Sequence, residues 1–283
     1  MINRSVLVLF SIIFLAGLDF AQDNLVTDSA IFLRKKQYFE SLGLKSKPIG
    51  NCMAELAKSF IGCKYRSHTL EQDGEESLVI NLREFDCTTF VEEMIALART
   101  FKAGGDFQDF KKRVTSIRYR DGKLNGYCSR LHYFSEWSQD NAAKGFVKNI
   151  TEQFGGVTRE LNLNFMSTHP AAYSKLSGNI ARIDSIRILE NKISGQKFYY
   201  IPKANVSKIE KDLHDGDIVG FTTGVPGLDI GHVALIVSGV DGRKYLIHAP
   251  QEGSTVMITK PSLGDYVRSV KKHTGVIILR PVE

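Results

Sequence analysis

The sequence predicts an α+β protein in which N-terminal helices pack on an antiparallel β-sheet or small barrel. Amphipathic helical patterns cover residues 28–43, 51–60 and the stretch that follows Cys87. From residue 217 to the end, short β-branched segments separated by Asp-Gly and other turns predict strands. The stretch between them, about 104–200, carries shorter helix and strand patterns.

Residues 1–21 are expected to form a cleaved secretory signal peptide. Arg4 precedes a short apolar run over 6–16, and Ala21 provides a small residue for cleavage, although Asp19 departs from the usual small residue three positions before the cut. The apolar run is too short to span a bilayer comfortably, and no cysteine follows it that would carry a lipid anchor. The mature chain is therefore expected in the periplasm or outside the cell.

The remaining residues, 22–283, are expected to form a single domain. Hydrophobic residues make up 43% of the chain and charged residues 24%, which is ordinary for a globular protein. Lys and Arg are scattered, so the formal charge of +6 favours a solvated surface over specific attraction to an anionic polymer such as the cell wall. No nucleic-acid motif is present, and no nucleic-acid partner is expected.

The four cysteines are Cys52, Cys63, Cys87 and Cys128. If Cys87 is a free nucleophile, the other three cannot all be paired, and nothing requires a bridge between Cys52 and Cys63. No Cys or His cluster has the spacing of zinc ligands, so neither a metal nor another cofactor is expected.

The segment 85–92 is the strongest candidate for a catalytic site. Cys87 directly follows Asp86, which can cap a helix, and apolar residues at helical spacing come after it. A thiol at a helix N-terminus faces unpaired N–H groups and the positive end of the macrodipole, so we expect a thiolate that forms more readily near neutral pH. The competing interpretation is a buried structural cysteine.

Elements of the middle region are expected from shorter patterns. Residues 78–82 predict a strand, 107–114 a helix, 114–127 a hairpin turning at Asp121-Gly122, and 181–202 a pair of strands. In the C-terminal third, the predicted strands cover 217–222, 230–239, 244–249, 255–259 and 275–280.

His232 and His248 fall on two neighbouring predicted strands. Because side chains alternate along a strand, both histidines serve one site only if they share a face of the sheet. A two-residue turn at Asp241-Gly242 would put them on opposite faces, whereas a three-residue loop over 240–242 puts them on the same face. The catalytic hypothesis therefore predicts a three-residue loop with a bulge and Gly242 in the left-handed conformation.

These motifs, in this order, resemble the NlpC/P60 superfamily of papain-like cell-wall hydrolases, and in particular the DUF1460 branch of N-acetylmuramoyl-L-alanine amidase-like proteins. The resemblance spans nearly all of the chain after residue 21. The segments that carry it are 85–92, 129–134, 166–170, 200–203, 227–232 and His248-Ala249.

The resemblance implies a papain-like core and a catalytic set of Cys87, His232 and His248. In that scheme His232 takes the thiol proton and His248 orients the His232 ring. Tyr65 would reach the reacting carbonyl, or else pack as an aromatic residue. Asp86 would bind a substrate amine, cap the helix, or do both.

The resemblance also implies that about 104–200 is a large insertion that carries substrate-recognition residues, and further binding candidates lie there. Arg130, His132 and Tyr133 are types that a cleft wall would use for a ligand with carboxylate and sugar groups, although a core aromatic stripe with a surface arginine fits the pattern equally well. Thr168 and His169 belong to the branch motif and precede Pro170, where His169 is as well explained by a surface or capping role.

The implied activity is cleavage of the N-acetylmuramoyl–L-alanine amide bond of muropeptides in cell-wall turnover or recycling, by a monomer. Two alternatives stay open: a γ-D-glutamyl–diamino acid endopeptidase, which is the commoner NlpC/P60 activity, and a non-catalytic cell-wall-binding module that keeps the fold.

Overall fold

The computed structural model of the chain describes residues 28–283, so the predicted leader over 1–21 lies outside the described residues. One layer of the molecule consists of a helix over 28–41, α2 (Ile49–Lys58), α3 (Cys87–Lys102) and α4 (Phe107–Arg118). Helix α3 is buried on nearly every side, because α2, α4 and strand β7 surround it.

The main sheet has eight strands in the order β4-β5-β10-β6-β7-β8-β9, with β3 beside β10, and every pairing in it is antiparallel. The fold class predicted from sequence, helices with a multi-strand antiparallel sheet, is confirmed. Its strands are β3 (Val147–Asn149), β4 (Val157–Arg159), β5 (Phe198–Pro202), β6 (Ile218–Thr223), β7 (Ile230–Ser238), β8 (Lys244–His248), β9 (Met257–Ile258) and β10 (His273–Pro281). A separate parallel pair, β1 (Lys64–Tyr65) and β2 (Glu84–Phe85), leads into α3.

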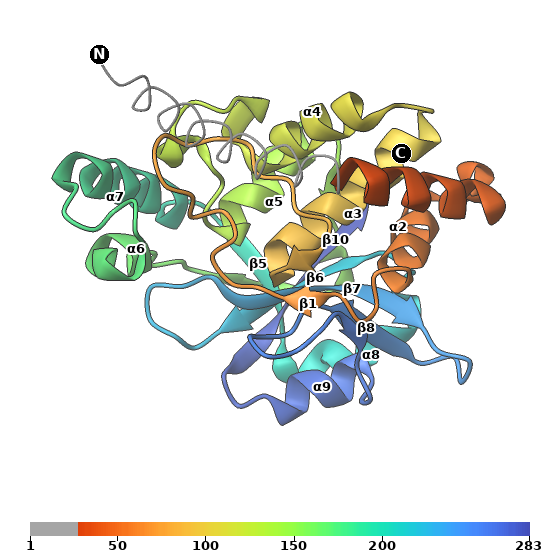
Figure 1. The fold of residues 1–283 in the computed structure, drawn as a ribbon. Coiled ribbons are helices and arrows are strands. Elements are labelled where there is room, and N and C mark those ends of the chain that lie inside the picture. Colours follow the sequence, from red (N-terminus) through yellow and green to blue (C-terminus); the bar gives the residue numbers. More distant parts are fainter. Residues whose placement is uncertain (1–27) are drawn as a thin grey trace, which may run out of the picture.

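Both faces of the sheet are covered, as Figure 1 shows. On β7, Val233 and Leu235 join the core beneath the N-terminal helices, whereas Ala234 and Ile236 join a second core on the opposite face. That second core is closed by α8 (Val206–Ile209) and α9 (Leu263–Ser269). The alternation of side chains along β7 thus decides which residues face which layer.

The middle region adds α5 (Phe134–Ala143), α6 (Phe165–Thr168) and α7 (Ile180–Ser194). Three local predictions here were wrong. Residues 78–82, which precede α3, form no strand. Helix α4 extends to Arg118 and so replaces the first strand of the hairpin expected over 114–127. Residues 180–194 form a helix instead of the first of two strands. Tertiary packing explains the helices, because Val114 and Ile117 of α4 and Ile186 and Ile193 of α7 are buried at helical spacing.

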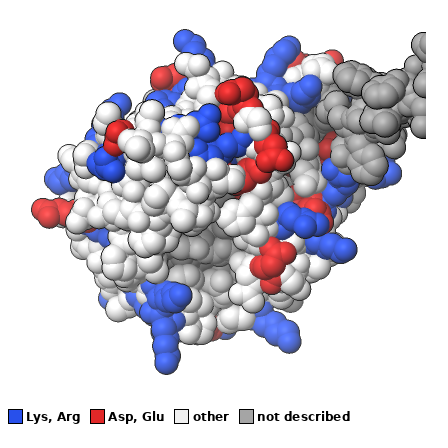
Figure 2. All heavy atoms as spheres, turned by 60° about the vertical axis from the view of Figure 1, so that its left-hand side comes forward, with Lys and Arg blue, Asp and Glu red and all other residues white. Residues whose placement is uncertain are grey.

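Surface charge is spread over the molecule. On the face in Figure 2, acidic and basic side chains lie mainly around a largely uncharged centre. All four cysteines are free thiols. Among residues 28–283, no helix combines the length and the apolar character needed to cross a membrane.

Candidate active site

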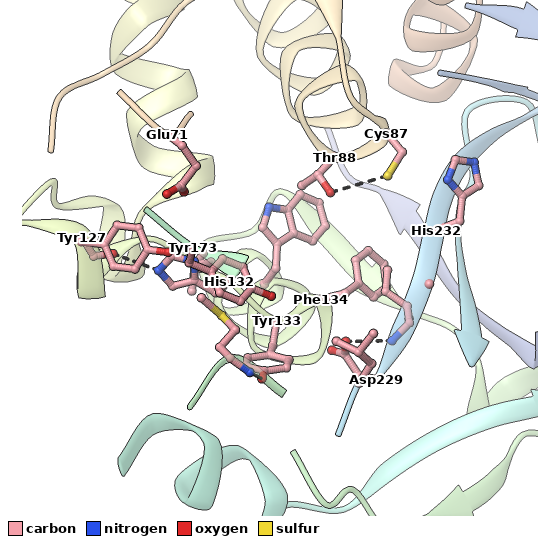
Figure 3. A pocket seen from close by; sticks show the side chains of 16 residues that line it. Glu71, Cys87, Thr88, Tyr127, His132, Tyr133, Phe134, Tyr173, Asp229 and His232 are labelled. Carbon is pink, nitrogen blue, oxygen red and sulfur yellow. Dashed lines mark hydrogen bonds between the residues drawn. The ribbon is translucent and has the colours of Figure 1, made fainter. Parts of the chain in front are cut away.

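A pocket of about 240 Å³ lies between the start of α3, the start of β7 and the segment that leads into α5. Cys87 and His232 border one end, and Glu71, Tyr127, His132 and Tyr173 border the other (Figure 3). The remaining lining residues are mainly apolar or aromatic and include Leu131, Tyr133, Phe134, Trp137, Met166, Leu228 and Ile230.

Asp86 places Cys87 at the first position of α3. One carboxylate oxygen, Oδ1, accepts hydrogen bonds from the backbone N–H groups of Thr88 and Thr89, at 2.9 and 2.7 Å. The Thr89 hydroxyl accepts in turn from the Asp86 N–H, at 3.0 Å, which completes a capping box. The predicted capping role of Asp86 is confirmed, and the half-buried Cys87 thiol faces the pocket 4.0 Å from the Thr88 hydroxyl.

The thiol is neutral in this setting, contrary to the expectation from its place at a helix N-terminus. Burial, and then the neighbouring Asp86 carboxylate, raise the pKa of Cys87 to about 12. The Val233 backbone and the Thr88 hydroxyl act in the opposite direction but do not compensate. The rise in pKa caused by desolvation therefore exceeds the lowering expected from the helix N-terminus. A base is needed to convert the Cys87 thiol into a nucleophile.

His232 and His248 lie on the same face of the sheet and contact each other, as expected for a three-residue loop between their strands. His232 Nε2 lies 2.7 Å from His248 Nδ1. Strands β7 and β8 pair Val237 with Tyr245 and Ser238 with Lys244, which is the register of a three-residue loop over 240–242. Gly242 has a φ of 78°, and Gly239 N–H donates to Arg243 O across the bulge, at 2.8 Å. The predicted loop, bulge and left-handed glycine are all confirmed.

Both imidazoles are uncharged near neutral pH. Burial, helped by the neighbouring His248 and His273, lowers the pKa of His232 to about 3, and burial lowers the pKa of His248 to about 4. The His232 ring also stacks on Phe221, with ring centroids 5.8 Å apart. Because Nε2 of the neutral His232 ring contacts His248, the other ring nitrogen, Nδ1, is the one available as a proton acceptor.

His132 and Tyr133 line the pocket, as the sequence predicts for substrate-binding residues, but both have partners within the protein. The Tyr133 hydroxyl donates to Glu190 Oε1 at 2.6 Å and accepts from the Met166 N–H at 3.2 Å. His132 Nε2 lies 3.0 Å from Tyr127 O, and burial lowers the pKa of His132 to about 3. The ring faces of His132 and Tyr133 are therefore more available to a ligand than their polar atoms.

Arg130 does not take the predicted role of a direct carboxylate ligand. Its guanidinium contacts Glu71 at 2.8 Å and Glu76 at 3.3 Å, lies over the Tyr127 ring, and leaves the side chain 6% exposed. Because both acidic partners come from a loop distant in sequence, the sequence pattern could not reveal them. Arg130 instead fixes the position of Glu71, which does line the pocket.

Thr168, His169 and Tyr65 are not among the residues that line the pocket. Thr168 and His169 are exposed and bond locally, to Asn164 O and Phe165 O. Tyr65 lies on β1 beside Phe85, and burial followed by the nearby Cys87 and Asp86 raises its pKa to about 12. Tyr65 therefore lies close to the nucleophile, whereas Thr168 and His169 do not reach the pocket.

Several pocket residues had no role in the sequence interpretation. Tyr127 and Tyr173 form the far end with Glu71, and the buried Tyr127 hydroxyl has no hydrogen-bond partner among residues 28–283. Asp229 accepts from Ser135 N–H at 2.6 Å and Ile230 N–H at 2.8 Å, which joins the start of α5 to the start of β7. Asp229 lies in the segment 227–232 that carries the resemblance, whereas Glu71, Tyr127 and Tyr173 lie in none of those segments.

The fold and the pocket together define an amidase-like α+β protein. The chain belongs to the N-acetylmuramoyl-L-alanine amidase-like family, whose pattern it matches over residues 55–276. Among curated proteins, none matches the chain.

Solved structures agree with this assignment. An N-acetylmuramoyl-L-alanine amidase from Bacteroides uniformis is 35% identical, with a TM-score of 0.78 over 83% of this chain and 99% of that one. A Bacteroides fragilis protein with the provisional name of xylanase is also 35% identical, with a TM-score of 0.74 over 79% and 98% of the two chains. A DUF1460 protein from Legionella pneumophila, 17% identical, shares the fold at a TM-score of 0.67 over 92% and 97%. The family and the amidase relative support a peptidoglycan amidase-like function.

Proposed function

We propose that the chain is a cysteine hydrolase of the NlpC/P60 type, with a papain-like core, that cleaves the N-acetylmuramoyl–L-alanine amide bond of muropeptides. The observation that carries this proposal is the presence of Cys87 and His232 at one end of a single pocket, with His232 Nε2 held 2.7 Å from His248 Nδ1. A neutral thiol and a neutral imidazole are the starting state for general-base activation of a nucleophile.

In the first half of the reaction, His232 Nδ1 accepts the Cys87 proton while Sγ attacks the carbonyl carbon of the lactyl amide. His248 accepts a hydrogen bond from His232 Nε2–H and thereby fixes the tautomer that leaves Nδ1 free. The tetrahedral intermediate collapses as the carbon–nitrogen bond breaks, and His232 gives its proton to the departing L-alanine amine. A thioester between Cys87 and the muramoyl group remains.

In the second half, water attacks the thioester with His232 again acting as the base. The carbon–sulfur bond breaks, the free muramic acid leaves, and Cys87 recovers its proton. The Cys87 backbone N–H, at the unpaired end of α3, and the protonated Tyr65 hydroxyl are the proposed donors to the oxyanion. Asp86 is proposed to contact a substrate amine in addition to its capping role.

The lining of the pocket suits a sugar-bearing acyl group. Tyr127, Tyr173 and Trp137 supply aromatic surface, and Glu71 supplies hydrogen-bond acceptors at the far end from Cys87. The pocket volume of about 240 Å³ suits a small sugar-bearing group. This size supports small muropeptides as substrates, processed by a monomer in the periplasm or outside the cell after removal of the proposed leader.

Mass spectrometry of muropeptides incubated with the protein, beside a Cys87→Ala control, tests the proposal. Free stem peptides that begin with L-alanine, absent from the control, are the expected products. Fragments that begin with the diamino acid would identify a γ-D-glutamyl endopeptidase instead. Retention of muropeptides without cleavage of any of them would identify a wall-binding module.

A further inference from the structure

A second cavity, of about 260 Å³, lies beside the active-site pocket. Arg159, Asn162, Asn164 and Thr223 contribute to its lining, and Leu228 borders both cavities. The loop that carries Leu228 is fixed in place, because the backbone N–H groups of Asn164 and Phe165 both donate to Gly227 O, at 3.3 Å. The two cavities therefore lie next to each other, and the hydrogen-bonded loop with Leu228 borders both.

Arg159 is a cation without an acidic partner. Its guanidinium donates through Nη2 to Thr223 O at 3.0 Å and lies 5.9 Å from the centre of the Tyr200 ring, both of which are neutral. Within residues 28–283, no carboxylate forms an ion pair with it, and Nη1 is shielded from water without a hydrogen-bond partner. A buried, unused guanidinium N–H is costly unless a ligand satisfies it, and a carboxylate matches the planar fork of arginine best.

Arg159 is connected to the histidine pair through strand β6, and this connection suggests which part of a substrate could reach it. On β6, Phe221 pairs with His232, and Thr223, whose carbonyl accepts a hydrogen bond from Arg159, lies two residues further along the same strand. In an extended peptide, the main-chain carboxylate of the second residue after a scissile amide nitrogen lies only about 7 Å from that nitrogen. A cavity that shares Leu228 with the pocket of Cys87 is therefore a candidate place for this carboxylate.

We propose that this second cavity is a carboxylate-binding subsite in which Arg159 holds the free α-carboxylate of the second stem-peptide residue. The inference rests on the proposed amidase function, because it places the sugar in the active-site pocket and the departing peptide across Leu228. Glu160 also lines the cavity, but it is exposed, so water and salt screen its repulsion of an anion. Asn162 and Asn164 add amide donors for the same group.

Two matched substrates test the subsite: N-acetylmuramoyl-L-alanyl-D-glutamate and its α-amide, each with the γ-carboxyl blocked as a methylamide. We expect the wild-type kcat/KM to be at least about tenfold higher for the free acid, as a charge-assisted pair predicts. Arg159→Gln should remove this preference, and Arg159→Lys, which keeps the charge but not the fork, should retain part of it. Arg187→Gln, which changes an exposed arginine on α7, should keep both rate and preference.

Equal rates for acid and amide in the wild type, or an unchanged preference in Arg159→Gln, would overturn the subsite while leaving the amidase proposal intact. If neither substrate is cleaved, the amidase proposal fails. Calorimetry then tests the subsite separately, by measuring the affinity for γ-blocked L-alanyl-D-glutamate and for its α-amide. The subsite predicts tighter binding of the acid by the wild type and no such difference in Arg159→Gln. Circular dichroism checks that Arg159→Gln is folded, and Arg159→Lys serves in its place if it is not.

Discussion

His232 Nε2 and His248 Nδ1 lie 2.7 Å apart because a three-residue loop sets the register of the hairpin between β7 and β8. The contact joins two buried, neutral rings on one face of the sheet. It is the structural basis for assigning His248 as the residue that positions the proposed base.

His248→Ala should lower kcat by about 100-fold with little change in KM, because the His232 ring loses the partner that fixes its tautomer. Steady-state kinetics on a muropeptide substrate measures this. His214→Ala, at an exposed histidine, is the control and should behave like the wild type. A change in KM alone would contradict a positioning role.

Gly242→Ala should reduce the free energy of unfolding by about 1 kcal/mol, because the φ of 78° at this position disfavours a side chain. Among residues 28–283, no atom lies within 4 Å of a Cβ added at this position, so the cost arises from the backbone conformation. Urea denaturation measures the effect. Gly195→Ala, at a φ of −74°, should be nearly neutral, and an equal loss in both variants would refute the conformational explanation.

Alkylation of Cys87 by iodoacetamide should accelerate about tenfold per pH unit between pH 6 and 9. The raised pKa of the thiol, about 12, and the lowered pKa of His232, about 3, leave a neutral pair in the free protein. Peptide mapping follows the modified cysteine and separates it from the other three. A rate that is already constant from pH 5 upward would reveal a thiolate–imidazolium pair and contradict this assignment.

His273 should make the protein less stable in acid. Burial lowers its pKa to about 4, so between its ordinary value of 6.5 and that value the unfolded state binds the proton and the folded state does not. The free energy of unfolding therefore falls as pH decreases through this window, by up to about 1.4 kcal/mol per pH unit.

His273→Gln should flatten the plot of unfolding free energy against pH between pH 6 and 5 by that amount. Urea titrations at several pH values measure it, with His68→Gln, at an exposed histidine, as the control. An identical slope in the wild type and His273→Gln would show that His273 is already protonated in the folded state.

Arg118→Met should destabilise the protein by about 3 to 5 kcal/mol, because it leaves two buried carboxylates of α3 without their cation. Arg118 lies 2.7 Å from Glu92 and 3.9 Å from Glu93, and all three side chains are almost fully buried. Thermal and urea unfolding measure the loss. Adding Glu92→Gln and Glu93→Gln should restore part of the stability, and no recovery would argue that packing, not charge, is responsible.

The C-terminal strands and the histidine pair could be predicted because their signals are local. The alternating apolar residues and the loop at Asp241-Gly242 lie within one hairpin, and the length of that loop decides whether His232 and His248 share a face. The capping role of Asp86 is equally local, since its partners Thr88 and Thr89 are two and three residues away.

What the sequence did not predict depends on contacts between distant segments. The pKa of Cys87 follows from burial beneath the assembled fold, and Arg130 is occupied by Glu71 and Glu76 from another loop. Isoleucine-rich residues 180–194 have high strand propensity, yet tertiary packing favours α7. The far end of the pocket is likewise assembled from residues 71, 127 and 173, which share no sequence motif.

Intact-protein mass spectrometry after rapid acid quench of the first turnover tests the central claim most directly. We expect a transient thioester adduct with the mass of the muramoyl group, mapped to Cys87 and absent from Cys87→Ala, which should not cleave the substrate. An adduct with the mass of a glycosylated L-alanyl-γ-D-glutamyl group would place the cleavage further along the stem peptide. Undiminished cleavage by Cys87→Ala would contradict the account outright.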